Sequence, residues 1–402
     1  MITVDQARQK FADAVQCQQR VESVTLNKSL MRIAAKDIVS KIDVPPSDNS
    51  AMDGFAINSK DLINGKTELL VSQRIQAGCD PLALSPGTAA RIFTGGVLPV
   101  GADAVVIQEN CVYGAGSKKV TILQSTNANN NIRRQGQDIS KGEMVIKKGS
   151  RLSAVDLALI AAIGKDEVDV FAPIKVAIFS TGNELAEPGQ PLKAGQIYNS
   201  NRTMLIAACE QLGYTVIDCG IVKDTLIATK EALKKASEQA DVIISSGGVS
   251  VGEEDHIKPA IEALGELEYW KVQMKPGKPV VLGKIAKTPI IGLPGNPVSS
   301  YIVFQLLALP LLQKLQGQTS SELISYSVIS EFDKKSVTRE EFIRVRLNRK
   351  NNHPATVETF DNQSSGVLSS LSWADGLVRQ HIDQSITKGD NVDFLPFYEG
   401  RL

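Results

Sequence analysis

Between residues 174 and 316 the sequence repeats one pattern, in which a short apolar run is followed by a loop and then by a segment with helical periodicity. The apolar runs KVAIFS and VIISS have the length and composition of strands that are buried on both faces. The helical segments NRTMLIAACEQLG and LIATKEALKKASEQA lie between them. Strands that alternate with helices favour a parallel sheet covered on both faces, so we predict a three-layer α/β domain over residues 171–320.

The rest of the sequence divides into three further regions. Residues 1–44 and 140–170 show helical periodicity and are predicted to form one discontinuous helical base domain. Residues 45–139 contain short β-type runs separated by Gly, Pro and Asn, so we predict a β-rich lobe that projects from the base. Residues 321–402 return to β-type runs and are predicted to form a C-terminal β-barrel domain. The predicted fold is therefore a multidomain α/β plus β architecture.

Charge and composition argue against several classes of protein. Lysine and arginine total 44, as do aspartate and glutamate, so no basic excess indicates nucleic acid or an anionic membrane as a partner. Residues 1–16 lack the apolar core of a signal peptide, and the longest apolar stretch, Tyr301–Leu312, is too short to span a bilayer. Five scattered cysteines without a CxxC pair, and three histidines, argue against a disulfide-rich or multi-histidine zinc protein. We therefore expect a cytoplasmic protein.

The loop that follows the apolar run ending at Ser246 combines glycines with acidic residues. Gly247 and Gly248 allow the backbone to turn sharply and to bring N–H groups close to a ligand. Three acidic residues follow, at positions 253–255. Backbone donors beside carboxylates at the end of a strand are typical of a site for a phosphate group held with a divalent cation. A glycine-rich turn with a solvated acidic tip is the alternative that this segment alone leaves open.

Acidic residues also follow other predicted strands of the α/β domain. Glu184 comes after KVAIFS and Asp224 after TVIDCGIV, so both should lie with Asp255 at the carboxyl-end edge of one sheet. The run PIIGL is followed by Pro294 and Asn296, which lead into a helix. Because clustered carboxylates repel one another unless a cation lies between them, we predict a shared divalent cation, with Mg²⁺ as the natural hard ion. Taken alone, Asp224 is more simply interpreted as a helix cap.

A rigid turn with two lysines, Lys275-Pro276-Gly277-Lys278-Pro279, lies between two of these strands. Its prolines and glycine restrict the backbone and hold the two ammonium groups at a short separation. Paired lysines suit an oxyanion such as phosphate, sulfate or molybdate. A surface turn with solvated lysines is the alternative.

Together these segments resemble the molybdopterin molybdenumtransferase family, which includes MoeA and the gephyrin E domain. The resemblance spans most of residues 45–300 in the family's order, whereas the C-terminal region matches only in short pieces. The matching strings are PPSDNSAMDGFAI, FTGGVLPVGADAVV, IRRQGQDI, FSTGNEL, GQIYNSN, SSGGVSVGEED, KPGKP and GLPGNPVS.

The resemblance implies an activity and an assembly. The activity is insertion of molybdenum from molybdate into molybdopterin, with adenylylated molybdopterin as the substrate and AMP as the leaving group, in a step that needs Mg²⁺ or another divalent cation. The α/β domain would bind molybdopterin, and the protein would form an elongated homodimer. Its partners would be a molybdopterin adenylyltransferase and downstream proteins of molybdoenzyme maturation. A molybdopterin adenylyltransferase activity of the chain itself, or a non-catalytic scaffold of the gephyrin type, are the alternatives.

The same resemblance assigns roles to individual residues. Because two of the catalytic positions, Asp53 and Thr94, belong to the lobe, we expect the lobe of a second subunit to close over the site; a turn cap is the alternative role of Asp53. The catalytic residues would be Asp53, Thr94, Glu184, Asp224 and Asp255, of which the last three would hold the metal. The substrate-binding residues would be Arg133, Asp138, Gly247, Gly248, Ser250, Pro294 and Asn296. The molybdate-binding residues would be Lys275, Lys278, Arg344 and Ser370, with Ser369 as the alternative to Ser370.

Overall fold

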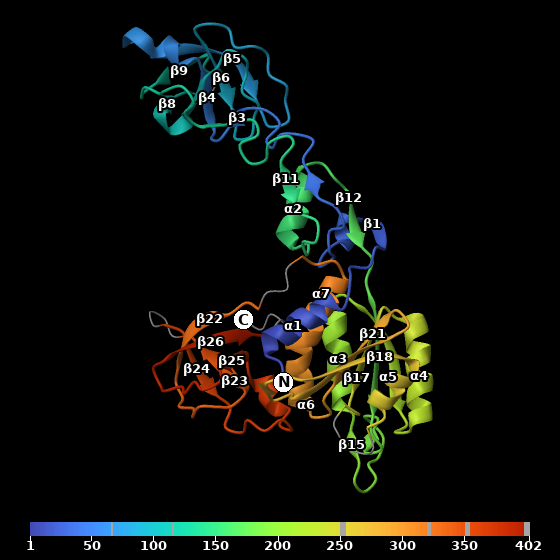
Figure 1. Cartoon of the computed structure of the whole chain (residues 1–402). Coiled ribbons are helices and arrows are strands. Elements are labelled where there is room, and N and C mark those ends of the chain that lie inside the picture. Colours follow the sequence, from blue (N-terminus) through green and yellow to red (C-terminus); the bar gives the residue numbers. More distant parts are fainter. Residues whose placement is uncertain (66, 115, 250–254, 320–322, 350–353, 398–402) are drawn as a thin grey trace.

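The chain folds into an elongated molecule with its bulk at two ends (Figure 1). This computed structural model describes residues 1–402 except positions 66, 115, 250–254, 320–322, 350–353 and 398–402. A β-rich lobe forms one end, a slender middle region connects it, and an α/β domain lies beside a C-terminal barrel at the other end. The multidomain α/β plus β fold class is therefore confirmed.

The α/β domain is built on a six-stranded mixed sheet. The neighbouring strands β16, β13, β17 and β21 run parallel, as the alternation of strands and helices predicts, whereas β20 and β18 are antiparallel additions at one edge. In order across the sheet the strands are β16 (Thr215–Val222), β13 (Lys175–Thr181), β17 (Val242–Ser246), β21 (Thr288–Leu293), β20 (Pro279–Ile285) and β18 (Gly265–Lys271).

Helices cover both faces of this sheet, which confirms the three-layer arrangement (Figure 1). Side chains alternate along each strand, so that on β17 Ile243 packs in the core under one pair of helices and Ile244 in the core under the other helices. The first face is covered by α4 (Leu226–Gln239) and α5 (Ile257–Leu264); the second by α1 (Val4–Asp13), α3 (Ser200–Gln211), α6 (Pro297–Val303), a π-helical turn (Phe304–Ala308) and α7 (Leu309–Leu315). The continuous stretch Pro297–Leu315 is long and apolar enough to cross a membrane, but 89% of it is buried inside the fold, so it is a core helix.

The predicted helical base is wrong for most of its N-terminal part. Within residues 1–44, α1 is the α-helix, and its Val4, Ala7 and Phe11 pack into the core of the α/β domain rather than into a separate base. This amphipathic face packs against α7 and the π-helical turn before it. The middle region instead consists of β1 (Val21–Thr25) paired with β12 (Glu167–Phe171), β2 (Ile38–Val39) paired with β11 (Met144–Ile146), and the helix α2 (Ala154–Ala162).

The lobe and the C-terminal domain are both β structures, as predicted. The lobe sheet has the order β7 (Ala104–Ile107), β4 (Gly54–Ile57), β6 (Thr88–Ile92), β5 (Glu68–Ile75), β9 (Lys119–Ile122) and β8 (Cys111–Val112). The strands of the C-terminal barrel are β22 (Tyr326–Ser330), β23 (Glu340–Asn348), β24 (Thr356–Thr359), β25 (Gly376–Gln380) and β26 (Asn391–Pro396). The barrel closes because β23 pairs with both β24 and β25.

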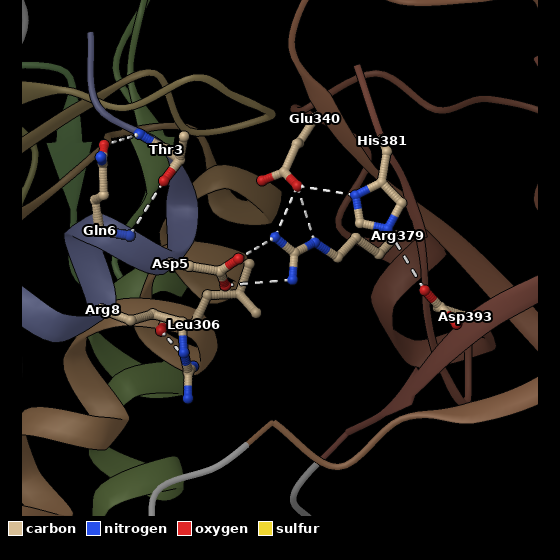
Figure 2. Close-up of polar contacts among 9 residues, drawn as sticks. All are labelled: Thr3, Asp5, Gln6, Arg8, Leu306, Glu340, Arg379, His381 and Asp393. Carbon is tan, nitrogen blue, oxygen red and sulfur yellow. Dashed lines mark hydrogen bonds and ion pairs between the residues drawn. The ribbon is translucent and has the colours of Figure 1, made fainter. Parts of the chain in front are cut away.

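Several contacts join the barrel to the α/β domain. The short strand β19 (Met274–Lys275) pairs in parallel with β23 and places Lys275 opposite Glu341. Helix α1 adds an ionic network, in which Arg379 Nη2 lies 2.8 Å from Asp5 Oδ2 and 2.7 Å from Glu340 Oε1 (Figure 2). Burial alone would lower the pKa of Arg379, but the hydrogen bonds to Asp5 and Glu340 raise it above its ordinary value.

Candidate functional site

A cavity of about 640 Å³ opens at the carboxyl ends of β13, β17 and β21, where the α/β domain faces the barrel. Loops of the α/β domain form one side, and β23 with the segment 363–365 forms the other. The position agrees with the rule that open α/β sheets bind ligands at this edge. The predicted residues that line the cavity are Glu184, Asp224, Gly247, Gly248, Asp255, Lys275, Lys278, Pro294, Asn296 and Arg344. The structure therefore brings together most of the site that the sequence predicted.

The glycine loop needs its glycines for steric reasons. Gly247 and Gly248 have φ angles of +91° and +66°, which lie in the left-handed region. A Cβ atom on Gly247 would lie 2.7 Å from the carbonyl oxygen of Thr181, and one on Gly248 would lie 2.7 Å from the Thr181 hydroxyl oxygen. Both positions therefore require glycine, which lets the loop pack directly against Thr181, while the Gly247 N–H donates to the Leu293 carbonyl oxygen at 3.0 Å. Ser250, which the resemblance assigns to substrate binding, lies outside the described residues.

A buried asparagine that the sequence did not single out joins two of these loops. Asn201 on α3 donates from Nδ2 to Ser246 Oγ at 2.9 Å and to the Gly295 carbonyl oxygen at 2.7 Å. It thereby holds the loop after β17 against the loop after β21. The string GQIYNSN contains this residue, but no spacing rule indicates which distant loops an asparagine side chain reaches.

The three carboxylates of Glu184, Asp224 and Asp255 share the cavity, but they do not form a closed metal cage. Among the described residues, no group of three His, Cys, Asp or Glu side chains is placed to hold a metal ion together. Glu184 lies against the backbone, since a Cβ on Gly182 would come within 2.5 Å of Glu184 Oε2. The helix-cap alternative for Asp224 is wrong, because Thr225 caps α4.

Cationic side chains line the same cavity. Lys275 and Lys278 lie there with Arg344, which comes from β23 and is only 1% exposed. Burial lowers the pKa of Arg344 to about 10, so the guanidinium stays charged at neutral pH. Its Nε donates to Ser370 Oγ at 2.9 Å, and its Nη2 donates to the carbonyl oxygens of Asn362 and Ser364 at 3.2 and 3.1 Å. The arginine is thus fixed before any anion binds.

Ser370 lies behind Arg344 and not in the wall of the cavity. It is fully buried, accepts the hydrogen bond from Arg344 Nε and donates to the Val367 carbonyl oxygen at 2.6 Å. Its single hydroxyl proton is therefore already donated within the protein. Ser369 is exposed and does not line the cavity either. The serines that do line it are Ser299 on α6 and Ser364 and Ser365 in the C-terminal region. Sequence reasoning missed the last two because the C-terminal region matches the family only in short pieces.

The remaining predicted residues lie in or near the lobe, at the far end of the molecule (Figure 1). Asp53 Oδ1 accepts hydrogen bonds of 2.8 Å from both the backbone N–H and the hydroxyl of Thr94. The backbone hydrogen bond, and then the hydroxyl, lower the pKa of Asp53. Arg133 and Asp138 are exposed. Within one chain, these four residues do not contribute to the cavity.

Three family models match consecutive parts of the chain. Residues 2–164 match the MoeA N-terminal region (domain I and II), residues 177–314 match a probable molybdopterin binding domain, and residues 331–397 match the MoeA C-terminal region (domain IV). The matches follow one another along almost the whole chain. Their order agrees with the order of the structural regions.

Individual relatives cover most or nearly all of the chain. A molybdopterin molybdenumtransferase of Haemophilus influenzae is 38% identical over 401 residues, which is 99% of each chain. One from Nostoc is 39% identical over 309 residues, covering 75% of this chain and 70% of the relative. Two crystal structures of the molybdopterin biosynthesis MoeA protein of Pyrococcus horikoshii have TM-scores of 0.80 and 0.84 at 33% and 29% identity, each over 99% of this chain and 99% and 100% of the other. The chain belongs to the MoeA family of molybdopterin molybdenumtransferases.

Proposed function

We propose that this protein inserts molybdenum from molybdate into adenylylated molybdopterin and releases AMP, as a step of molybdenum cofactor biosynthesis. The observation that carries the proposal is the composition of one cavity. The glycine loop, three carboxylates, two lysines and a buried arginine all line it. A phosphate-bearing substrate and an oxyanion can therefore be held next to each other. Membership of the family supports the same reaction.

Each group of residues in the cavity has a distinct task. We assign the glycine loop, which lines the cavity at the end of β17, to the phosphate of the substrate. Lys275, Lys278 and Arg344 bind the molybdate dianion through charge-assisted hydrogen bonds. The fixed guanidinium of Arg344 orients the anion.

The three carboxylates are suited to a hard cation such as Mg²⁺. Glu184, Asp224 and Asp255 offer oxygen ligands at the phosphate side, and Mg²⁺ commonly takes one or two carboxylates with substrate phosphates as further ligands. When bound, the ion would stabilise negative charge on the pyrophosphate.

The oxyanion role is tested by Lys278→Ala. Each charge-assisted contact contributes roughly 1.5–3 kcal/mol, so the molybdate concentration at half-saturation of AMP release should rise about tenfold to a hundredfold. Affinity for adenylylated molybdopterin should change little. Lys284→Ala, which removes an exposed lysine from β20, is the matched control. An unchanged half-saturation with a collapse in substrate affinity would instead place the lysines on the substrate phosphate.

We further propose that the active form is a homodimer in which the lobe of one subunit covers the cavity of the other. The support is the distance, within one chain, between the Asp53–Thr94 pair and the cavity (Figure 1). Sedimentation should then give about twice 43.3 kDa.

Subunit mixing tests the shared site. Asp53→Ala and Asp255→Ala proteins should each be inactive, and subunit exchange between them should restore about a quarter of the wild-type rate, because a mixed two-fold dimer regains one intact site. Each homodimer prepared alone is the control. A fully active monomer, or no recovery after confirmed subunit exchange, contradicts the proposal.

Two alternative functions give different results in the same assay. A molybdopterin adenylyltransferase would form the adenylylated compound and would not need molybdate, whereas insertion makes AMP release depend on molybdate. A gephyrin-like scaffold would have no turnover, so catalysis by the isolated protein counts against it. We place the reaction in the cytoplasm, between an adenylyltransferase that supplies the substrate and proteins that mature molybdoenzymes, with no nucleic acid or membrane involved.

A further inference from the structure

Glu341 lines the cationic part of the cavity although it is negatively charged. Its side chain is only 3% exposed, and its Oε1 lies 3.3 Å from Lys275 Nζ and 3.0 Å from Lys334 Nζ. Its Oε2 has no hydrogen-bond partner in the part of the chain that the structure describes. The two lysines that share one of its oxygen atoms therefore make its direct ion pairs, and the Arg344 guanidinium adds a further positive charge that interacts with it electrostatically. Burying a carboxylate without such compensation is costly.

The two lysines that share this oxygen differ in how they are held. The side chain of Lys275 is 51% exposed and lies in the cavity, where we place molybdate. The side chain of Lys334 is 27% exposed and is absent from the cavity lining. The backbone of Lys334 is fixed to the barrel by two hydrogen bonds with Ile386, of 2.7 and 2.8 Å. Lys334 is thus the partner that stays with Glu341, and Lys275 is the partner that can turn from Glu341 to an anion in the cavity.

An arriving oxyanion and Glu341 compete for the ammonium group of Lys275. If Lys275 turns to the anion, Glu341 must still be neutralised, because it remains buried beside a new negative charge. Lys334 provides that neutralisation from outside the cavity. We infer that Lys334 is a positioning residue of the oxyanion site, which releases Lys275 from Glu341 so that Lys275 can bind molybdate. This inference rests on the proposed function and deepens it.

The inference is tested by Lys334→Met with and without Glu341→Gln. When Glu341 is unchanged, Lys334→Met should raise the molybdate concentration at half-saturation about tenfold, which corresponds to about 1.4 kcal/mol. The reason is that Lys275 is then the only lysine left to pair with the buried Glu341 carboxylate. The rate at saturating molybdate should stay within about twofold. In the Glu341→Gln protein there is no charge to neutralise, so adding Lys334→Met should change half-saturation less than about twofold.

Two variants control the charge and the site. Lys334→Arg keeps the positive charge and should bind molybdate like the wild type. Lys335→Met removes the exposed neighbouring lysine, one residue further along the chain, and should have no effect. Circular dichroism of every variant checks the fold. If Lys334→Met does not fold, the contrast between Lys334→Gln and Lys334→Arg replaces it.

The outcomes separate this inference from a simple effect of charge. If Lys334→Met lowers molybdate affinity equally with Glu341 present and with Glu341→Gln, Lys334 only adds positive potential. That result would overturn the inference. An unchanged half-saturation in Lys334→Met would overturn it as well. The same series is measured by calorimetric titration of molybdate into the protein without substrate. A wild type that binds molybdate but releases no AMP refutes the proposed function, and the calorimetric cycle still decides the role of Lys334.

Discussion

Replacing Asp255 with alanine should lower metal-dependent AMP release at least about a hundredfold, since loss of an outer partner of a metal site already costs about 10–100-fold. Asp255 lines the phosphate side of the cavity with Glu184 and Asp224, just before α5. Its removal takes away one of the hard oxygen ligands that this side can offer. The measurement is AMP release as a function of Mg²⁺ concentration at saturating molybdate.

Two comparisons make the result specific. Asp255→Asn keeps the size of the side chain without its charge and should lose as much activity as the alanine variant. Glu231→Ala removes an exposed carboxylate on α4, away from the cavity, and should behave as wild type. Molybdate half-saturation in any residual activity should be nearly unchanged, unlike in Lys278→Ala. Normal turnover by a folded Asp255→Ala protein would remove Asp255 from the mechanism.

Replacing Arg379 with methionine should lower the free energy of unfolding by about 3–5 kcal/mol. Glu340 is 6% exposed and depends on Arg379, whose Nε and Nη2 donate to Glu340 Oε1 at 3.0 and 2.7 Å. Without the arginine, a buried carboxylate remains with His381 as its neighbour at 3.3 Å (Figure 2). The contact with Asp5 adds little, because Asp5 is 65% exposed. Urea unfolding followed by circular dichroism measures the change.

A matched surface pair and a double variant test the cause. Arg20 pairs with Asp241 but is 51% exposed, so Arg20→Met should change stability by no more than about 1 kcal/mol. The double variant Glu340→Gln with Arg379→Met should recover much of the loss, because no unpaired charge stays buried. A double variant as unstable as Arg379→Met alone would mean that the arginine acts through packing and not through its charge.

The parts of the site that lie on the sheet edge could be predicted from the sequence. Glu184, Asp224 and Asp255 each follow a strand, and parallel strands bring their carboxyl ends to one edge, so local patterns sufficed. The lysine turn was predictable because its prolines and glycine lie next to each other in the sequence. Glycine spacing likewise indicated the loop at Gly247.

Other parts depend on contacts between distant segments, which a single sequence does not specify. Asn201 reaches two loops, and Glu341 meets Lys275 only because β19 joins the barrel sheet. Ser370 was assigned to the anion from a short match, and its hydrogen bond to Arg344 became visible only in three dimensions. Helix α1 was correctly expected as a helix, but its packing partner lies about three hundred residues away and could not be inferred from its own periodicity.

The docking of α1 must wait until late in translation, because its partners are synthesised long after it. The apolar residues Val4, Ala7 and Phe11 pack with α7, and Asp5 pairs with Arg379, which lies 374 positions later. At a ribosomal speed of about 5–20 residues per second, Arg379 is made roughly 20–75 seconds after Asp5. The first helix therefore emerges with its apolar face uncovered and waits for segments that are synthesised near the end. Nascent chains of this protein should accordingly be clients of ribosome-associated chaperones until the barrel has been translated.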